Sequence, residues 1–170
     1  MSVIIVDNFL DPILIDLLNI KFLYETPHTW GHSSNSFSQN HEKEDMFYAA
    51  NLDSNDFTLK YIHLKLSNHL RLQTEIKRVY INIQHNNMKG NFHYDDGDIT
   101  TLLMITPTPQ KGGQFEYIDQ NNKIKTIPYE QNKLIVFNGI KHRGCCYVDD
   151  KPRITLAYKL NIVKTKLQWK

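Results

Sequence analysis

Cysteine is nearly absent from this 170-residue chain, which carries only Cys145 and Cys146. Two neighbouring cysteines are poorly placed to bridge each other, so the sequence predicts no disulfide framework and a reducing, cytoplasmic location. An excess of one charge sign is also lacking, because 20 Lys and Arg stand against 18 Asp and Glu, for a formal net charge of +2. That balance does not by itself indicate a nucleic-acid or membrane partner.

Long apolar runs are missing as well, so no stretch is predicted to span a bilayer. The opening segment MSVIIVDNFLDPILIDLL is apolar but contains Asp7, Asp11 and Asp16. It lacks a basic start and a small-residue cleavage site, so we do not expect a signal peptide. No repeat or low-complexity block divides the chain. The sequence therefore predicts a single domain over 1–170, present as a monomer or weak homodimer.

Capping signals and apolar spacing predict two helices in the first part of the chain. Asp11 followed by Pro12 is typical of a helix start, and apolar residues then recur at helical spacing. A second helix is predicted over 55–70, where leucine and isoleucine share one face. A short strand is predicted over 2–9, and strand character dominates after Leu70.

The segment from Tyr24 to Asn51 interrupts this pattern, because it is rich in serine, asparagine and histidine. The sequence predicts a long loop here, and long loops in compact domains are often functional. With Trp30, Phe37 and Phe47, this segment is predicted to act as a lid or substrate-recognition loop.

Two predicted strands, 77–85 and 152–163, alternate strictly between apolar and polar residues. Their polar faces carry Tyr80, Asn82 and Gln84 on the first strand, and Arg153, Thr155 and Lys159 on the second. The simplest interpretation is that each polar face meets water. The alternative is a small barrel or sandwich whose polar faces line an internal site while helices cover its apolar outside.

The stretch GNFHYDDGD favours an internal site, because it combines ligands suited to a metal ion. His93 and Asp95 are separated by one residue, so in an extended segment both side chains point the same way. His142 follows the apolar strand KLIVF and supplies a third ligand. Two imidazoles and one carboxylate suit non-haem Fe(II), with zinc as the competitor. Arg153 follows eleven residues later, and a surface salt bridge is its simplest alternative role.

These residues carry a family resemblance over roughly 77–160, and the opening VDNFLD with the helix after it extends the resemblance to most of the chain apart from 24–51. HYD, GGQFEY, NKLIVFNGIKHRG and KPRITLAY together resemble the core of the 2-oxoglutarate and Fe(II)-dependent oxygenases, within them the prolyl 4-hydroxylase-like branch. The resemblance implies that His93, Asp95 and His142 hold iron. It also implies that Arg153 and Thr155 bind the distal carboxylate of 2-oxoglutarate. Tyr80, Asn82 and Gln84 are candidates for contacts with this cosubstrate or for support of the metal ligands.

The fold that this resemblance implies is mainly β with flanking helices (α+β). Its core, over 76–165, would be a double-stranded β-helix of the jelly-roll, cupin-like kind. A strand and helices over 1–75 would pack on the outside as support.

The implied function is hydroxylation of a C–H bond, most readily of proline in a protein or peptide, using Fe(II), 2-oxoglutarate and O2, with ascorbate as a further cofactor. Two alternatives stay open. One is an oxygenase of the same superfamily that acts on a nucleobase or small molecule. The other is a non-catalytic, cupin-like metal-binding domain, which would lack the Arg153 and Thr155 carboxylate clamp.

Three positions depart from the prolyl hydroxylase-like pattern. Gln84 stands where that branch commonly has tyrosine. Asn82 and Gln84 fall where the nucleic-acid dealkylating branch has asparagine and tyrosine, and Lys159 falls where it has a further arginine. These departures leave the substrate open without affecting the cofactor prediction.

Overall fold

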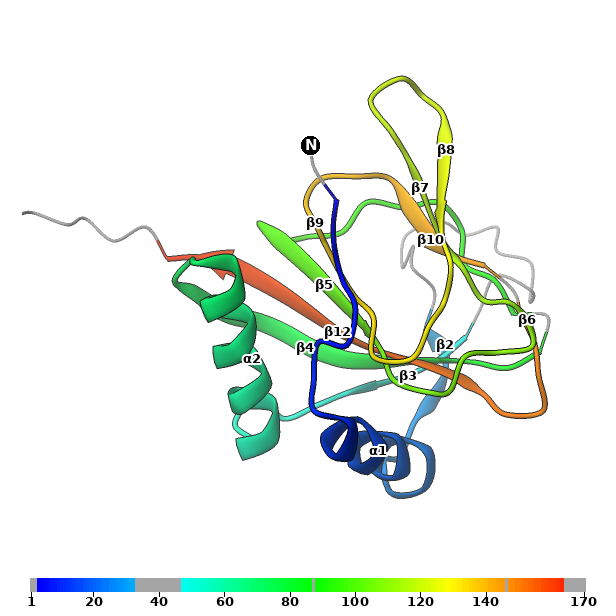
Figure 1. The fold of residues 1–170 in the computed structure, drawn as a ribbon, viewed down its shortest axis with the longest axis horizontal. Helices are drawn as coiled ribbons and strands as arrows, with labels where there is room; N and C mark the ends of the chain where they lie inside the picture. The colour runs from blue at the N-terminus through cyan, green and yellow to red at the C-terminus, as the bar shows by residue number, and fades with distance from the viewer. Residues whose placement is uncertain (1–2, 33–46, 87, 146, 164–170) are drawn as a thin grey trace, which may run out of the picture.

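A computed structural model describes residues 3–32, 47–86, 88–145 and 147–163 of the chain. Strands dominate it, and two helices lie to one side (Figure 1). The helical elements are α1 (Pro12–Ile20), the π-helical turn η1 (Lys21–Glu25) and α2 (Phe57–Leu70). The strands are β1 (Ile4–Val6), β2 (Thr29–His32), β3 (Phe47–Asn51), β4 (Thr74–Gln84), β5 (Ile99–Met104), β6 (Lys111–Gly112), β7 (Phe115–Ile118), β8 (Ile124–Ile127), β9 (Leu134–Phe137), β10 (His142–Gly144), β11 (Tyr147–Val148) and β12 (Arg153–Ile162).

The described strands form a seven-stranded sheet with the order β1-β9-β5-β12-β4-β3-β2, a smaller sheet with the order β10-β7-β8, and the pair β11-β6. All pairings are antiparallel. Figure 1 shows β7, β8 and β10 on the side of the large sheet opposite to α1 and α2. This mostly β architecture with outer helices confirms the predicted fold class.

The alternation of β4 and β12 separates a packed outer face from a polar inner face. The apolar residues of both strands join those of the two helices in one buried cluster, which includes Ile15, Leu18, Leu59, Ile62, Leu66, Val79, Ile81, Ile83, Ile154, Leu156 and Tyr158. A fully buried side chain of this size contributes about 1.5–3 kcal/mol to stability. The helices thus cover the apolar outside, and the polar residues face inward, as the second interpretation predicted.

Both helices begin at an aspartate that caps the first turn: Asp11, as the sequence predicted, and Asp56, which the sequence analysis did not single out. Asp11 accepts a hydrogen bond from the Ile13 backbone N–H at 2.9 Å, and Pro12 takes the first helical position of α1. Asp56 accepts from the Leu59 N–H at 3.1 Å at the start of α2. Lys21 contacts Asp56 at 2.8 Å, which joins the end of α1 to the start of α2.

The predicted loop from Tyr24 to Asn51 is wrong at both ends. Helical structure continues to Glu25, and β2 and β3 extend the large sheet, with β3 paired to β4. Local composition missed these strands because the pairing partner lies far along the chain. Phe37 lies outside the described residues, as do the side chains of Trp30 and Phe47, so the lid role stays a prediction.

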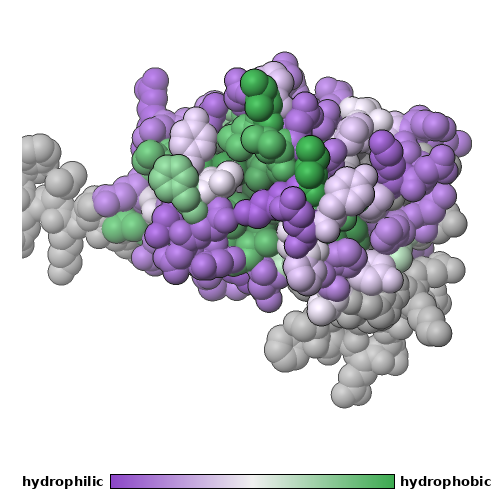
Figure 2. Space-filling view, turned by 90° about the horizontal axis from the view of Figure 1, so that it is seen from below, coloured by the Kyte–Doolittle hydropathy of each residue, from purple (hydrophilic) through white to green (hydrophobic). Residues whose placement is uncertain are grey.

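The outer face of α1 is apolar at the surface. The side chains of Ile13, Leu17 and Ile20 are about half exposed or more. Figure 2 shows hydrophobic residues gathered on the underside of the molecule. None of the described helices has the length and hydropathy required to cross a membrane. The expectation of a monomer or weak homodimer stays a prediction.

Candidate metal centre and cosubstrate pocket

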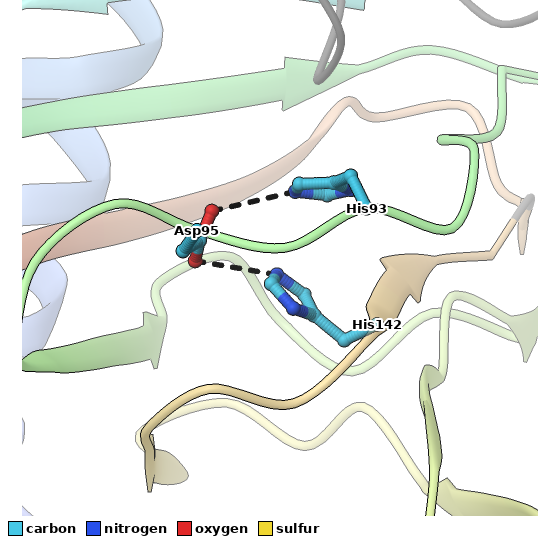
Figure 3. Close-up of side chains that lie close together, drawn as sticks. All are labelled: His93, Asp95 and His142. Atoms are coloured by element: carbon cyan, nitrogen blue, oxygen red, sulfur yellow. Dashed lines mark ion pairs between the residues drawn. The ribbon is translucent and has the colours of Figure 1, made fainter.

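His93, Asp95 and His142 meet at one point on the inner side of the fold (Figure 3). A backbone bridge causes this meeting, because His93 and His142 exchange two hydrogen bonds of 3.0 and 2.9 Å. β10 begins at His142 and also pairs with β7. One ligand atom from each of the three side chains lies within 4.8 Å of the other two. This spacing is small enough for a single ion to contact all three.

Both imidazoles present their Nε2 atoms to the centre in a defined tautomer. His93 Nδ1 lies 2.8 Å from the Asn91 carbonyl, and His142 Nδ1 lies 3.1 Å from the Ile140 carbonyl. A carbonyl oxygen only accepts, so Nδ1 carries a proton in both rings, and in the neutral form of each ring the lone pair is on Nε2. Burial lowers the pKa of His142 to about 4, which keeps this ring neutral near pH 7.

Asp95 is largely buried between these rings. Its Oδ1 lies 3.5 Å from His93 Nε2, and its Oδ2 lies 3.4 Å from His142 Nε2. Burial would raise the pKa of this carboxyl, but its close contacts with His93 and with the Lys159 ammonium hold the pKa well below the usual range. Asp95 is therefore a carboxylate at neutral pH.

This donor set fits a non-haem iron centre. Two imidazoles and one carboxylate, grouped on one side, leave further coordination positions for small ligands. Zinc accepts the same donors, so the residue types alone do not select iron. The three ligand atoms are held by backbone and side-chain hydrogen bonds, as is usual for metal sites.

Arg153 lies beside this centre and is only 5% exposed, which excludes the surface salt bridge. Its Nε donates to the Gly113 carbonyl at 2.9 Å, and its Nη1 donates to Gln84 Oε1. The guanidinium also lies 4.9 Å from the ring centre of Tyr129. Burying a cation is costly unless polar or charged groups compensate it. A buried arginine that faces a cavity is therefore suited to binding an anion.

A cavity of about 70 Å³ joins Arg153 to the metal centre. All eight residues singled out from the sequence line it: Tyr80, Asn82, Gln84, His93, Asp95, His142, Arg153 and Thr155. The strand register explains this, since Arg153 pairs with Gln84 and Thr155 with Asn82 across β12 and β4. The structure thus brings the predicted site residues together, and their individual roles stay predictions.

Asn82 provides an independent sign of a ligand. Its Oδ1 is buried and has no hydrogen-bond partner within the described part of the chain. Buried polar atoms are nearly always hydrogen-bonded in folded proteins. The side chain lines the same cavity as Arg153. A bound molecule or water would satisfy it.

Further residues that shape this pocket were not predicted to do so from the sequence. Lys159 contacts Asp95 Oδ2, and Thr100 donates to the same oxygen at 2.9 Å. Gly144 is close to Gln84 and Arg153, so that a Cβ here would lie 3.0 Å from Gln84 Oε1. Lys159 was visible on the polar face of its strand, whereas nothing local marked Thr100 or Gly144.

No protein-family model and no curated protein matches the sequence. Many solved structures resemble the fold, among them the following three. A prolyl hydroxylase from Trichoplax adhaerens, in complex with a hypoxia-inducible-factor peptide, has a TM-score of 0.72 and 17% identity over 92% of this chain and 83% of that one. A prolyl-4-hydroxylase from Pseudomonas putida has a TM-score of 0.67 and 13% identity, over 92% of this chain and 91% of that one. An α-ketoglutarate-dependent non-haem epimerase of nogalamycin biosynthesis has a TM-score of 0.68 and 10% identity, over 92% of this chain and 76% of that one.

These likenesses define the class of fold. The chain has the double-stranded β-helix fold of the 2-oxoglutarate and Fe(II)-dependent oxygenases, as the motifs predicted. Within that class, prolyl 4-hydroxylases are among the structures it resembles. Because the identities are low, the likeness establishes the fold and leaves the reaction to be argued from the site.

Proposed function

We propose that this protein is an Fe(II)- and 2-oxoglutarate-dependent dioxygenase that hydroxylates a C–H bond. The observation that carries the proposal is the His93, Asp95 and His142 cluster sharing one cavity with buried Arg153. When bound, iron and 2-oxoglutarate supply the oxidising chemistry, in which O2 and 2-oxoglutarate yield succinate, CO2 and one oxygen atom for the substrate. The protein supplies the ligands, the orientation and the exclusion of water.

Arg153 and Thr155 would bind the distal carboxylate of 2-oxoglutarate. Both lie on β12 two residues apart, so their side chains share the inward face. The Arg153 guanidinium can pair with a carboxylate through charge-assisted hydrogen bonds. The hydrogen bonds of Arg153 to Gln84 and Gly113 fix its orientation before the cosubstrate arrives, which lowers the entropic cost of binding.

We further propose that the substrate is a prolyl residue in a protein or peptide. Support comes from prolyl hydroxylases among the similar structures, one of them bound to a peptide. The epimerase shows that the same fold also serves small-molecule chemistry, so a small-molecule substrate is the second candidate. The cupin-like alternative without catalysis is disfavoured, because it gives no reason to bury Arg153 at the cavity.

The direct experiment supplies the protein with Fe(II), 2-oxoglutarate and ascorbate under air, with and without proline-containing peptides. Succinate is measured by NMR, and the peptides are examined by mass spectrometry for the gain of one oxygen atom. We expect peptide-dependent succinate release that Asp95→Ala abolishes. Succinate release that no peptide stimulates, with small molecules or nucleobases oxidised instead, would move the substrate to the second candidate. Absence of any turnover of 2-oxoglutarate would overturn the proposed enzyme class.

A further inference from the structure

Lys159 is the most deeply buried charged residue at the site. Its side chain is 1% exposed, and its ammonium contacts Asp95 Oδ2 and donates to Thr100 Oγ1 at 3.2 Å. The strand register fixes this position, since Lys159 pairs with Thr100 between β12 and β5. Burying an ammonium is costly unless it is paired, and the partner here is a predicted metal ligand. The position therefore calls for an explanation beyond packing.

The two oxygens of Asp95 lie in different surroundings. Oδ2 accepts from Thr100 at 2.9 Å and contacts Lys159, whereas Oδ1 faces His93 Nε2 at 3.5 Å. Oδ2 is also 3.4 Å from His142 Nε2, so both oxygens are within reach of one ion. Carboxylates bind metals through one oxygen or through both. The hydrogen bonds to Oδ2 decide between these two modes.

We propose that Lys159 is a positioning residue that, together with Thr100, restricts Asp95 to binding the metal through Oδ1 alone. This inference rests on the proposed function. Two imidazoles and one carboxylate oxygen occupy half of an octahedral site and leave the other half for a chelating cosubstrate and O2. A carboxylate that bound through both oxygens would take one of those positions. Lys159 thereby keeps the cosubstrate position open.

The substitution that tests this is Lys159→Met, which keeps the length of the side chain and removes its charge and hydrogen bonds. Lys159→Arg is the conservative variant that restores a cationic donor. Thr100→Val removes the other hydrogen bond to Oδ2 and serves as a second test if Lys159→Met does not fold. The matched control is Lys133→Met, because Lys133 is also buried and paired with carboxylates, at 2.9 Å from Glu130 and 3.7 Å from Asp7.

The first measurement is made on Mn(II)-loaded protein without cosubstrate. Broadening of the Mn(II) EPR signal in ¹⁷O-enriched water reports how many waters the ion binds. We expect Lys159→Met and Thr100→Val to bind one water fewer than the parent, and Lys159→Arg and Lys133→Met to match the parent. An unchanged water count in both Lys159→Met and Thr100→Val would overturn the inference.

The second measurement titrates 2-oxoglutarate into the Fe(II)-loaded proteins without oxygen. We expect Lys159→Met to bind it about 10- to 100-fold more weakly, a loss of the size that metal affinity or activity typically shows when a partner of a metal ligand is removed. Lys159→Arg should recover most of the affinity. Parent affinity in Lys159→Met would contradict the inference. If the parent itself does not bind 2-oxoglutarate, the proposed function fails, and the water count still decides the role of Lys159.

Discussion

At the scale of single residues, the site depends on hydrogen-bond partners that orient the side chains of the two histidines and of Arg153. The carbonyls of Asn91 and Ile140 fix the histidine tautomers. Gln84 and the Gly113 carbonyl fix the Arg153 guanidinium. A metal ion and an anion would therefore meet side chains that are already oriented, and binding would need little rearrangement.

Arg153→Ala tests the carboxylate clamp. Loss of a hydrogen bond to a charged group costs about 2 kcal/mol, or roughly 30-fold in affinity. We expect the KM for 2-oxoglutarate to rise by about this factor or more, while Mn(II) affinity stays near that of the parent. Both quantities can be measured by steady-state kinetics and calorimetry. If Arg153→Ala turned over 2-oxoglutarate with the parent KM, the clamp assignment would be wrong.

Gly144→Ala tests how tightly the clamp is built. A Cβ at this position would lie 3.0 Å from Gln84 Oε1 and 3.2 Å from Arg153 Nη1, so the guanidinium must shift. We expect the affinity for 2-oxoglutarate to fall by about tenfold, since displaced polar contacts of this kind cost about 1–2 kcal/mol. Metal affinity should be unchanged. An unchanged affinity for 2-oxoglutarate would mean that Arg153 adapts freely.

At the scale of elements, the junction of α1, η1 and α2 supports the outer face of the sheet. Asp56 caps α2 and pairs with Lys21. The hydrogen bond from Lys21, against a smaller opposing effect of burial, lowers the pKa of Asp56 below 3.8. The group thus stabilises the fold at neutral pH, and this contribution is lost as the pH falls from 3.8 through the lower folded-state pKa.

Asp56→Ala should lower the free energy of unfolding by about 1 kcal/mol at pH 7, the usual cost of losing a helix cap. Asp56→Asn should cost less, because asparagine also caps helices. Urea denaturation followed by circular dichroism measures both. We expect the difference between the parent and Asp56→Asn to disappear below the folded-state pKa of Asp56. A difference that persisted at strongly acidic pH would contradict the assigned role of its charge.

The elements also show how far the sequence could predict this structure. Alternation in 77–85 and 152–163 predicted two strands, because that pattern is local, and the metal-type motif between them favoured polar faces that point inward. The strands β2 and β3 were missed, because they form by pairing with the distant β4. His93, Asp95, His142 and Arg153 were found by residue type and spacing. The contact of Lys159 with Asp95 was not, because it depends on the register of β12 with β5.

At the scale of the whole molecule, two buried clusters hold the site between them. One packs the helices on the large sheet, and the other fills the space around β7 and β9, where Phe115 and Phe137 both lie against His142 at ring distances of 5.3 and 4.5 Å. The predicted metal ligands come from separate segments joined through these sheets. Ligand binding should therefore stabilise the fold as a whole.

We expect Mn(II) with 2-oxoglutarate to raise the midpoint of thermal unfolding. A ligand present at 100 times its Kd stabilises by about 2.7 kcal/mol, which corresponds to roughly 5–10 °C for a domain of this size. Scanning calorimetry of the parent and of Asp95→Ala measures the shift. The variant should show almost none. A shift of equal size in Asp95→Ala would place the bound metal elsewhere on the protein.

The most direct test of the central claim is an anaerobic titration of the metal-free protein with Fe(II) and then with 2-oxoglutarate, followed by visible absorption. Iron chelated by a keto acid gives a weak charge-transfer band in the visible region. We expect this band in the parent, its absence in Asp95→Ala, and its appearance only at higher 2-oxoglutarate concentration in Arg153→Ala. No band in the parent, together with tight zinc binding, would mean that the residues around His93 form a metal site without this cosubstrate.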